Sequence, residues 1–240
     1  MPARRFFVEG VRAAGERVAI GGADAHKIVA VLRLRDGDSI ELVDSAGTQF
    51  DARVCVEDGD VSASLLSARL ADLERIRSVD VAQAVPKGQK MDFIVEKATE
   101  LGAHAILPFY SERSVAHAPG AAKVDRWRRL ARSAAQQCGR RFVPEIDPVV
   151  SFDELLERFD GYDAVLFPWE LAPAAPLREH LPQVLEGASR VLVVVGPEGG
   201  FSHAEADAAE SRGAYLVWLG ERILRTETAA MVLLAILEYL

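Results

Sequence analysis

The sequence predicts an α/β protein in which a small, strand-rich N-terminal part precedes a larger part of alternating strands and helices. Two observations support this fold class. Up to about residue 70, short Val-, Ile- and Phe-rich segments recur about every ten residues between turn motifs such as Asp36-Gly37-Asp38. From residue 79 onward, strand-like segments alternate with helix-like segments, as in a mostly parallel sheet covered by helices. We therefore expect domains over 1–74 and 75–240.

The N-terminal part contains four strand candidates and one helix candidate. Apolar and β-branched residues favour strands over 5–8, 39–43, 49–56 and 61–66. A helix is expected over 24–32, and residues 70–77 form a charged bridge to the second part. Closely spaced short strands of this kind predict a small barrel or sandwich.

The C-terminal part contains five strand candidates with helices between them. The strands are expected over 79–85, 105–109, 164–167, 191–195 and 214–219. Helical patterns cover 91–101, 124–137, 151–159, 203–212 and 227–239. Gly102 supplies a stop for the first of these helices. The last helix is apolar nearly all round, so we expect it to be deeply buried or shared with a second subunit.

Composition argues against several classes of protein. The longest strongly apolar run, 229–237, is about half the roughly 20 residues that a membrane span needs. No secretory signal follows the first arginines. Cys55 and Cys138 have no metal-ligand spacing, and neither have the 5 histidines, so we expect unpaired thiols and no metal site. These features predict a soluble, cytoplasmic protein.

The formal net charge of −8 conceals a basic middle segment. Residues 75–145 carry 13 basic and 7 acidic side chains, a net of +6, whereas residues 1–74 and 146–240 have nets of −4 and −10. A uniformly acidic surface would repel nucleic acid, but a segregated basic segment allows contact with RNA through a restricted face. A solvated surface remains the alternative interpretation. Trp127 lies among the arginines, and core packing is favoured there over stacking on a base.

Ligands of open α/β sheets bind in the loops at the carboxyl ends of the strands, and three such loops occur, at 168–170, 196–201 and 220–226. The second loop is rich in glycine, which lets the backbone approach a ligand closely. Ser202 and Glu205 then form a capping box for the next helix. The loop matches neither common phosphate-binding pattern, and Glu198 would repel a phosphate. A tight connection, or a ligand that is uncharged or cationic near Glu198, fits better.

The third loop places apolar residues in a polar context. Ile223 and Leu224 stand between Arg222 and Arg225, and Thr226 is expected to cap the final helix. Two interpretations are open. The apolar pair plugs the end of the sheet, or it lines an apolar slot while Arg225 reaches for an anion such as an RNA phosphate.

Six segments spread along the whole chain share the pattern of one enzyme family. They are RRFFV at 4–8, HKIVAVLRLRDGD at 26–38, KATELGAHAILPFYSERS at 97–114, RWRRLARSAAQQCGRRFVPEI at 126–146, GPEGGFSHAE at 196–205 and LGERILRTETA at 219–229. Through them the sequence resembles the bacterial small-subunit (16S) ribosomal RNA uridine-N3 methyltransferases of the SPOUT superfamily. The resemblance implies a SPOUT-type C-terminal domain with a deep trefoil knot, a topology that periodicity does not suggest. It also implies a small N-terminal PUA-like β-barrel for RNA recognition, and a homodimer.

The resemblance further implies S-adenosylmethionine (SAM) as cofactor and 16S ribosomal RNA, or the small ribosomal subunit, as partner, without membrane or metal. The cofactor residues expected on this basis are Phe167, Gly196, Pro197, Glu198, Gly199, Gly200, Leu219, Gly220, Ile223, Leu224, Arg225 and Ala229. RNA contacts are expected from Arg4, Arg5, Arg33, Lys87, Lys90, Arg113, Arg128, Arg140 and Arg141.

Methyl transfer to uracil N3 requires loss of the N3 proton. Glu198 or Glu227 would accept that proton as a base, or Arg225 would stabilise the developing negative charge as a cation, and the sequence leaves these alternatives open. N3 lies on the Watson–Crick edge, so the target uridine must be unpaired when it reacts. Two other functions remain: a related SPOUT enzyme for another RNA site, and a non-catalytic RNA-binding or ribosome-assembly protein. The intact cofactor loops weigh against the latter.

Overall fold

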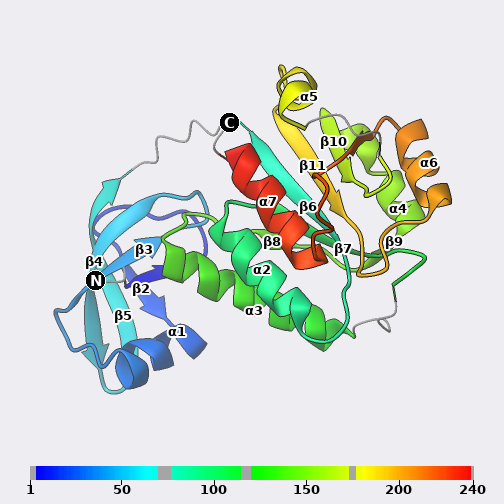
Figure 1. Ribbon diagram of the computed structural model, residues 1–240. Helices are drawn as coiled ribbons and strands as arrows, with labels where there is room; N and C mark the ends of the chain where they lie inside the picture. The colour runs from blue at the N-terminus through cyan, green and yellow to red at the C-terminus, as the bar shows by residue number, and fades with distance from the viewer. Residues whose placement is uncertain (1–3, 70–76, 115–119, 173–176, 239–240) are drawn as a thin grey trace. The chain divides into compact units, whose positions relative to one another are not determined.

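The computed structural model describes residues 4–69, 77–114, 120–172 and 177–238 (Figure 1). They form two compact units. The first comprises residues 4–69 together with Ala135–Phe142, and the second comprises residues 77–134 and 143–238. Short-range sequence patterns do not show that Ala135–Phe142 joins the first unit. The expected bridge lies outside the described residues except for Arg77.

A five-stranded sheet forms the first unit, in the order β1-β3-β4-β5-β2. Its strands are β1 (Arg5–Phe7), β2 (Arg17–Ile20), β3 (Ser39–Val43), β4 (Gln49–Glu57) and β5 (Asp60–Arg69). β1 pairs with β3 in parallel, and the other pairs are antiparallel. The predicted helix is confirmed as α1 (Gly22–His26), which continues as a π-helical turn over Lys27–Val31. β2 was not predicted.

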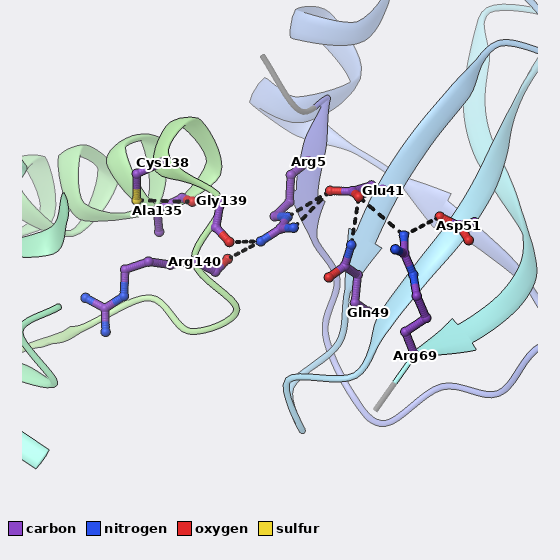
Figure 2. A network of polar contacts seen from close by, with 9 residues as sticks. All are labelled: Arg5, Glu41, Gln49, Asp51, Arg69, Ala135, Cys138, Gly139 and Arg140. Atoms are coloured by element: carbon purple, nitrogen blue, oxygen red, sulfur yellow. Dashed lines mark hydrogen bonds and ion pairs between the residues drawn. The ribbon is translucent and has the colours of Figure 1, made fainter. Parts of the chain in front are cut away.

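Arg5 is the centre of a polar network inside the first unit (Figure 2). Its side chain is 8% exposed, and it donates hydrogen bonds to Glu41 over 2.9 and 3.1 Å. It also donates to the backbone carbonyls of Gly139 and Arg140, just after helix α3 (Ala121–Cys138). Glu41 accepts a further hydrogen bond of 2.7 Å from Gln49. The expectation that Arg5 contacts RNA is therefore corrected, because its guanidinium is buried and bonded within the unit.

The second unit contains a seven-stranded sheet whose pairings are all parallel, which confirms the predicted sheet type. The main order is β12-β10-β11-β6-β7-β8, and β9 also pairs with β7. The strands are β6 (Ser78–Ala84), β7 (Ala105–Tyr110), β8 (Glu145–Ile146), β9 (Val150–Ser151), β10 (Ala164–Pro168), β11 (Arg190–Val195) and β12 (Tyr215–Val217).

Helices cover both faces of this sheet (Figure 1). They are α2 (Lys90–Glu100), α3 (Ala121–Cys138), α4 (Phe152–Leu156), α5 (Leu177–Val184), α6 (His203–Ser211) and α7 (Thr226–Glu238). Side chains of α2, α3 and α7 pack in one apolar core, and those of α4 and α6 pack in the other. Strand β6 contributes Val79 and Val81 to the first core and Ala82 and Ala84 to the second, as the alternation of a strand requires.

Two apolar features predicted from the sequence have clear positions. Trp127 is fully buried in the first core, and its indole nitrogen donates a hydrogen bond of 3.1 Å to Asp92, so the core interpretation is confirmed. Helix α7 buries Leu233, Leu234 and Leu237 against the sheet. Its other apolar side chains are only partly buried: Met231, Val232, Ala235 and Ile236.

Within the described ranges, no helix is long and apolar enough to cross a membrane. No group of three or more His, Cys, Asp or Glu side chains in those ranges could hold a metal ion. Cys55 and Cys138 are both free thiols.

Candidate active site

A cavity of about 500 Å³ opens at the carboxyl ends of β10 and β11 and at the start of α7. All three loops identified from the sequence contribute to its wall, in agreement with the rule for open α/β sheets. The volume lies within the range of small-molecule sites. The lining residues are Lys90, Pro168, Glu170, Val195, Gly196, Pro197, Glu198, Gly199, Gly200, Phe201, Ile223, Leu224, Arg225, Thr226 and Ala229.

The glycine loop after β11 lines this cavity and leads directly into α6. The predicted capping box is confirmed: the Ser202 hydroxyl accepts the Glu205 N–H over 3.2 Å, and the Glu205 carboxylate accepts the Ser202 N–H over 2.9 Å. Gly200 has a φ of +65°, in the left-handed region that favours glycine. The Glu170 carboxylate lies 2.6 Å from the point that a Cβ on Gly200 would occupy.

Phe167 supports the loop from below and does not itself line the cavity. It is fully buried, and its ring centroid is 4.1 Å from that of Phe201. The Phe201 ring in turn lies 3.0 Å from the position of a Cβ on Gly196. The side chain of Phe167 therefore does not line the cavity, and the next residue, Pro168, forms the wall there; a contact of Phe167 with the cofactor stays a prediction.

The apolar pair of the third loop lies between two hollows. Ile223 and Leu224 line the main cavity and also a neighbouring one of about 150 Å³, in which Leu219 and Gly220 lie. Ile223 is 89% exposed, so it does not plug the sheet end, whereas Leu224 packs against the first core of the second unit. These contacts favour the apolar-slot interpretation.

A buried hydrogen-bond chain ties the second loop to the third. The Thr226 hydroxyl donates to the Gly196 carbonyl over 2.6 Å and accepts from Gln83 Nε2 over 2.8 Å. Thr226 thus begins α7 without capping it, which corrects the expected N-cap. The first backbone bonds of the helix are accepted by the Arg225 carbonyl. Gln83 lies on β6, so a single threonine connects three segments around the cavity.

If the cavity binds SAM, as the sequence resemblance implies, replacing Thr226 by valine is expected to weaken that binding about tenfold. The methyl group keeps the shape of the side chain but removes the donor to the Gly196 carbonyl, and it leaves Gln83 Nε2 with only its bond to the Ala84 carbonyl, a loss of about 1–3 kcal/mol. Thr226→Ser keeps the hydroxyl and should stay within about threefold of wild type. Isothermal titration calorimetry measures both dissociation constants. Equal affinities for the two variants would show that the hydroxyl does not position the loops.

Lys90 stands between two carboxylates at the edge of the cavity. Its ammonium donates a hydrogen bond of 2.8 Å to Glu198 and lies 3.8 Å from Glu227. Glu198 also accepts the backbone N–H of Lys87 over 3.2 Å. Partial burial acts to raise the pKa of Glu198, but hydrogen bonds from Lys90 and from backbone N–H groups outweigh it and lower that pKa. The bond to Glu198 raises the pKa of Lys90.

Sequence reasoning placed Lys90 among RNA contacts and did not identify Glu170 or Thr226 as cavity residues. The signals available were weak. Lys90 begins the helix that follows β6 after a short turn, and Glu170 lies in a loop that was singled out without a specific residue.

Comparison with known proteins identifies the family. The RNA methyltransferase domain family matches residues 74–238. A Bacillus subtilis ribosomal RNA small subunit methyltransferase E is 32% identical over 250 residues, which cover 98% of this chain and 96% of that protein. The Mycobacterium bovis enzyme of the same name is 35% identical over 247 residues, covering 98% and 90%. The chain belongs to the ribosomal RNA small subunit methyltransferase E family.

Solved structures agree with this family assignment. A ribosomal RNA small subunit methyltransferase E from Neisseria gonorrhoeae, bound to S-adenosyl methionine, superposes with a TM-score of 0.88 at 30% identity, covering 99% of this chain and 97% of that one. A Legionella pneumophila methyltransferase in complex with SAM gives a TM-score of 0.83 at 26% identity, covering 100% and 98%.

In this member of the methyltransferase E family, the basic residues expected to contact RNA lie in both units. Arg4 and Arg33 are exposed in the first unit, and Arg140 and Arg141 are half-buried there. Lys87 is exposed in the second unit.

Two further arginines of the second unit are engaged within the protein. Arg113 donates a hydrogen bond of 3.1 Å to the Gly199 carbonyl, so it supports the glycine loop. Arg128 donates to the Ile146 carbonyl over 3.1 and 3.3 Å. Both side chains are still partly open to solvent.

Proposed function

We propose that this protein transfers a methyl group from SAM to N3 of a uridine in the ribosomal RNA of the small subunit (16S). One observation supports the proposal above all: residues 196–200 and 223–225, which carry the methyltransferase E pattern, come together around one cavity. The named relatives are small-subunit ribosomal RNA methyltransferases, and one of them was solved with SAM. A ribosomal RNA substrate would place the reaction in the cytoplasm.

The residues around the cavity suit this cofactor. The glycines leave backbone next to the ligand, and Ile223 and Leu224 offer apolar contact for an adenine ring. Glu170 and Glu198 place two carboxylates in the wall, which a sulfonium cation tolerates better than a phosphate does. When bound, the cofactor supplies a methyl group activated by its positively charged sulfur. The protein then has to align that methyl group with the uracil nitrogen and keep water away.

The sequence offers two candidate catalytic groups at the cavity, Arg225 as a cation and Glu198 as a base. Arg225 lines the cavity with an exposed side chain, where it can meet an RNA phosphate or the charge that develops on the uracil. Glu198 already accepts hydrogen bonds from Lys90 and Lys87, and its lowered pKa makes it a weak proton acceptor. These contacts favour stabilisation by a cation over proton removal by Glu198.

We propose the remaining architecture from the same family pattern. The second unit would hold the trefoil knot, and the five-stranded first unit would be a PUA-like barrel that recognises RNA. The half-buried apolar side chains of α7 would pack against a second copy of the chain in a homodimer. Light scattering tests the last point, because a strict monomer would contradict it.

Mass-spectrometric mapping of ribosomal RNA tests the proposed function. A strain lacking the gene should lose N3-methyluridine at one position of the small-subunit RNA. Purified protein with SAM should restore that methyl group on RNA or subunits from the strain. An unchanged N3-methyluridine content would refute the proposal, and loss of a different modified base would indicate another RNA site.

A further inference from the structure

Lys90 is a cation that faces the cavity but was not needed to explain cofactor binding. It begins α2, directly after the turn that follows β6, and its side chain lines the cavity beside Glu198 and Arg225. The nearest carboxylates belong to distant segments: Glu198 is 108 positions away along the chain, and Glu227 lies in the first turn of the last helix. The fold therefore brings the ammonium to the cavity and holds it there.

Among the residues that the structure describes, the partners of the Lys90 ammonium leave an N–H for a ligand. A lysine carries three donors. One donates to Glu198 at 2.8 Å, and the 3.8 Å separation from Glu227 is an ion pair that is too long for a hydrogen bond. The charged groups that face Lys90 are Glu198 from the glycine loop, and Glu227 and Arg225 from the start of α7. On its own helix, Asp92 is already paired with Arg126 and Trp127.

The two carboxylates also indicate which kind of ligand the ammonium suits. Glu198 and Glu227 offset its charge, so a permanently charged phosphate gains little attraction there. A neutral carbonyl that becomes negative during the reaction gains more, because its hydrogen bond to an ammonium strengthens as charge develops. The uracil oxygens beside N3 behave in this way when N3 loses its proton.

We propose that Lys90 is a catalytic residue that donates a hydrogen bond to a uracil oxygen flanking N3, with Glu198 as its positioning residue. The inference rests on the proposed function. The N3–H bond breaks, the proton passes to a solvent base, and the electron pair stays on the ring and its oxygens. N3 then bonds to the methyl carbon while the carbon–sulfur bond breaks and its electron pair remains on sulfur.

Three variants test this role: Lys90→Met removes the charge, Lys90→Arg keeps it, and Lys97→Met is the matched control on the same helix. Lys97 pairs with Glu96 and Glu100 on the surface of α2, away from the cavity. Circular dichroism and thermal unfolding check that each variant folds. Calorimetry gives the SAM dissociation constant without any turnover.

Single-turnover methylation is then measured at saturating SAM on small subunits reconstituted with uridine or 5-fluorouridine RNA. Fluorine at C5 makes the N3 proton more acidic. It therefore stabilises the negative charge on the uracil that the Lys90 ammonium would otherwise stabilise. On uridine RNA we expect the Lys90→Met rate to be about 100-fold below the wild-type rate. On 5-fluorouridine RNA this deficit should be smaller by a factor of at least about five. Lys90→Arg should stay within about tenfold of wild type, and SAM affinity should change less than about threefold in all variants.

The pH dependence supplies a second readout. Between pH 6 and 9 Glu198 stays ionised, because its pKa is lowered, and Lys90 stays charged, because its pKa is raised. The change of rate with pH then reports the loss of the proton from uracil N3. The wild-type rate should level off at a lower pH than the Lys90→Met rate, which should still rise at pH 9.

Two results would overturn the role of Lys90. One is a Lys90→Met variant that binds SAM at least tenfold more weakly but reacts normally once saturated, since Lys90 would then hold the cofactor. The other is an equal loss of rate on uridine and 5-fluorouridine RNA. If the wild-type enzyme leaves N3 unmethylated, the proposed function itself is refuted. That result comes from the wild-type protein alone and is therefore distinct from a failure of the Lys90 proposal.

Discussion

Replacing Trp127 by alanine is expected to lower the free energy of unfolding by about 3–5 kcal/mol, the usual cost of removing a large aromatic side chain from a core. Trp127 on α3 is fully buried in the first core of the second unit, and its indole nitrogen donates to Asp92 on α2. The substitution leaves a cavity and removes that hydrogen bond. Urea denaturation followed by circular dichroism measures the loss.

Arg129→Ala is the matched control, because Arg129 lies on the exposed side of the same helix. It should change the free energy of unfolding by no more than about 0.5 kcal/mol. A Trp127→Ala protein of normal stability that has lost RNA affinity would contradict the core assignment and restore the base-stacking alternative.

Replacing Gly200 by valine is expected to weaken SAM binding at least about tenfold. A left-handed backbone costs a residue with a Cβ about 1–2 kcal/mol, and a β-branched side chain suits it least. The new Cβ would also lie 2.6 Å from a Glu170 oxygen, but that exposed side chain can move aside, so the backbone strain at a φ of +65° is the main cost. The loop relieves this strain by leaving its present conformation. Ligand binding must then restore that conformation, which lowers the affinity. Calorimetry measures the dissociation constant.

Gly213→Val controls for backbone strain alone. Gly213 has a φ of +86° just after α6, nothing lies within 4 Å of its Cβ position, and it does not line the cavity. The variant should lose stability but bind SAM normally. If Gly200→Val bound SAM as well as Gly213→Val does, the glycine loop would not be the cofactor site.

Sequence patterns predicted the longer elements of the second unit well because each repeats a local signal. The apolar run at Arg190–Val195 is long enough to identify a buried strand, and residues 91–101 show helical spacing that matches α2 within one residue. β8 and β9 were missed because two residues each carry no periodicity and form strands only by pairing with β7. α5 was missed as well; Pro182 lies within it, against the usual pattern.

The sequence located the loops that form the site. It did not predict which contacts the individual side chains make there. The glycine loop and the apolar pair can be recognised in the sequence because their residue types are unusual in short connections. The type of a charged residue, however, does not specify its partner. Arg5 and Lys90 both looked available for RNA, yet the first bonds Glu41 and the second bonds Glu198.

The sequence by itself determined the α/β class and the alternation of strands and helices that gives a parallel sheet. It also determined the capping box at Ser202 and the three loops that form the cavity. Each depends on neighbours within a few positions, where backbone geometry turns residue type directly into structure. Only the tertiary structure decided that Gln83, Thr226 and Gly196 share one hydrogen-bond chain and that Lys90 meets Glu198. These partners are 30 to 143 positions apart. A hydrogen bond depends on separation in space, which the packing of the parallel sheet sets and local sequence does not record.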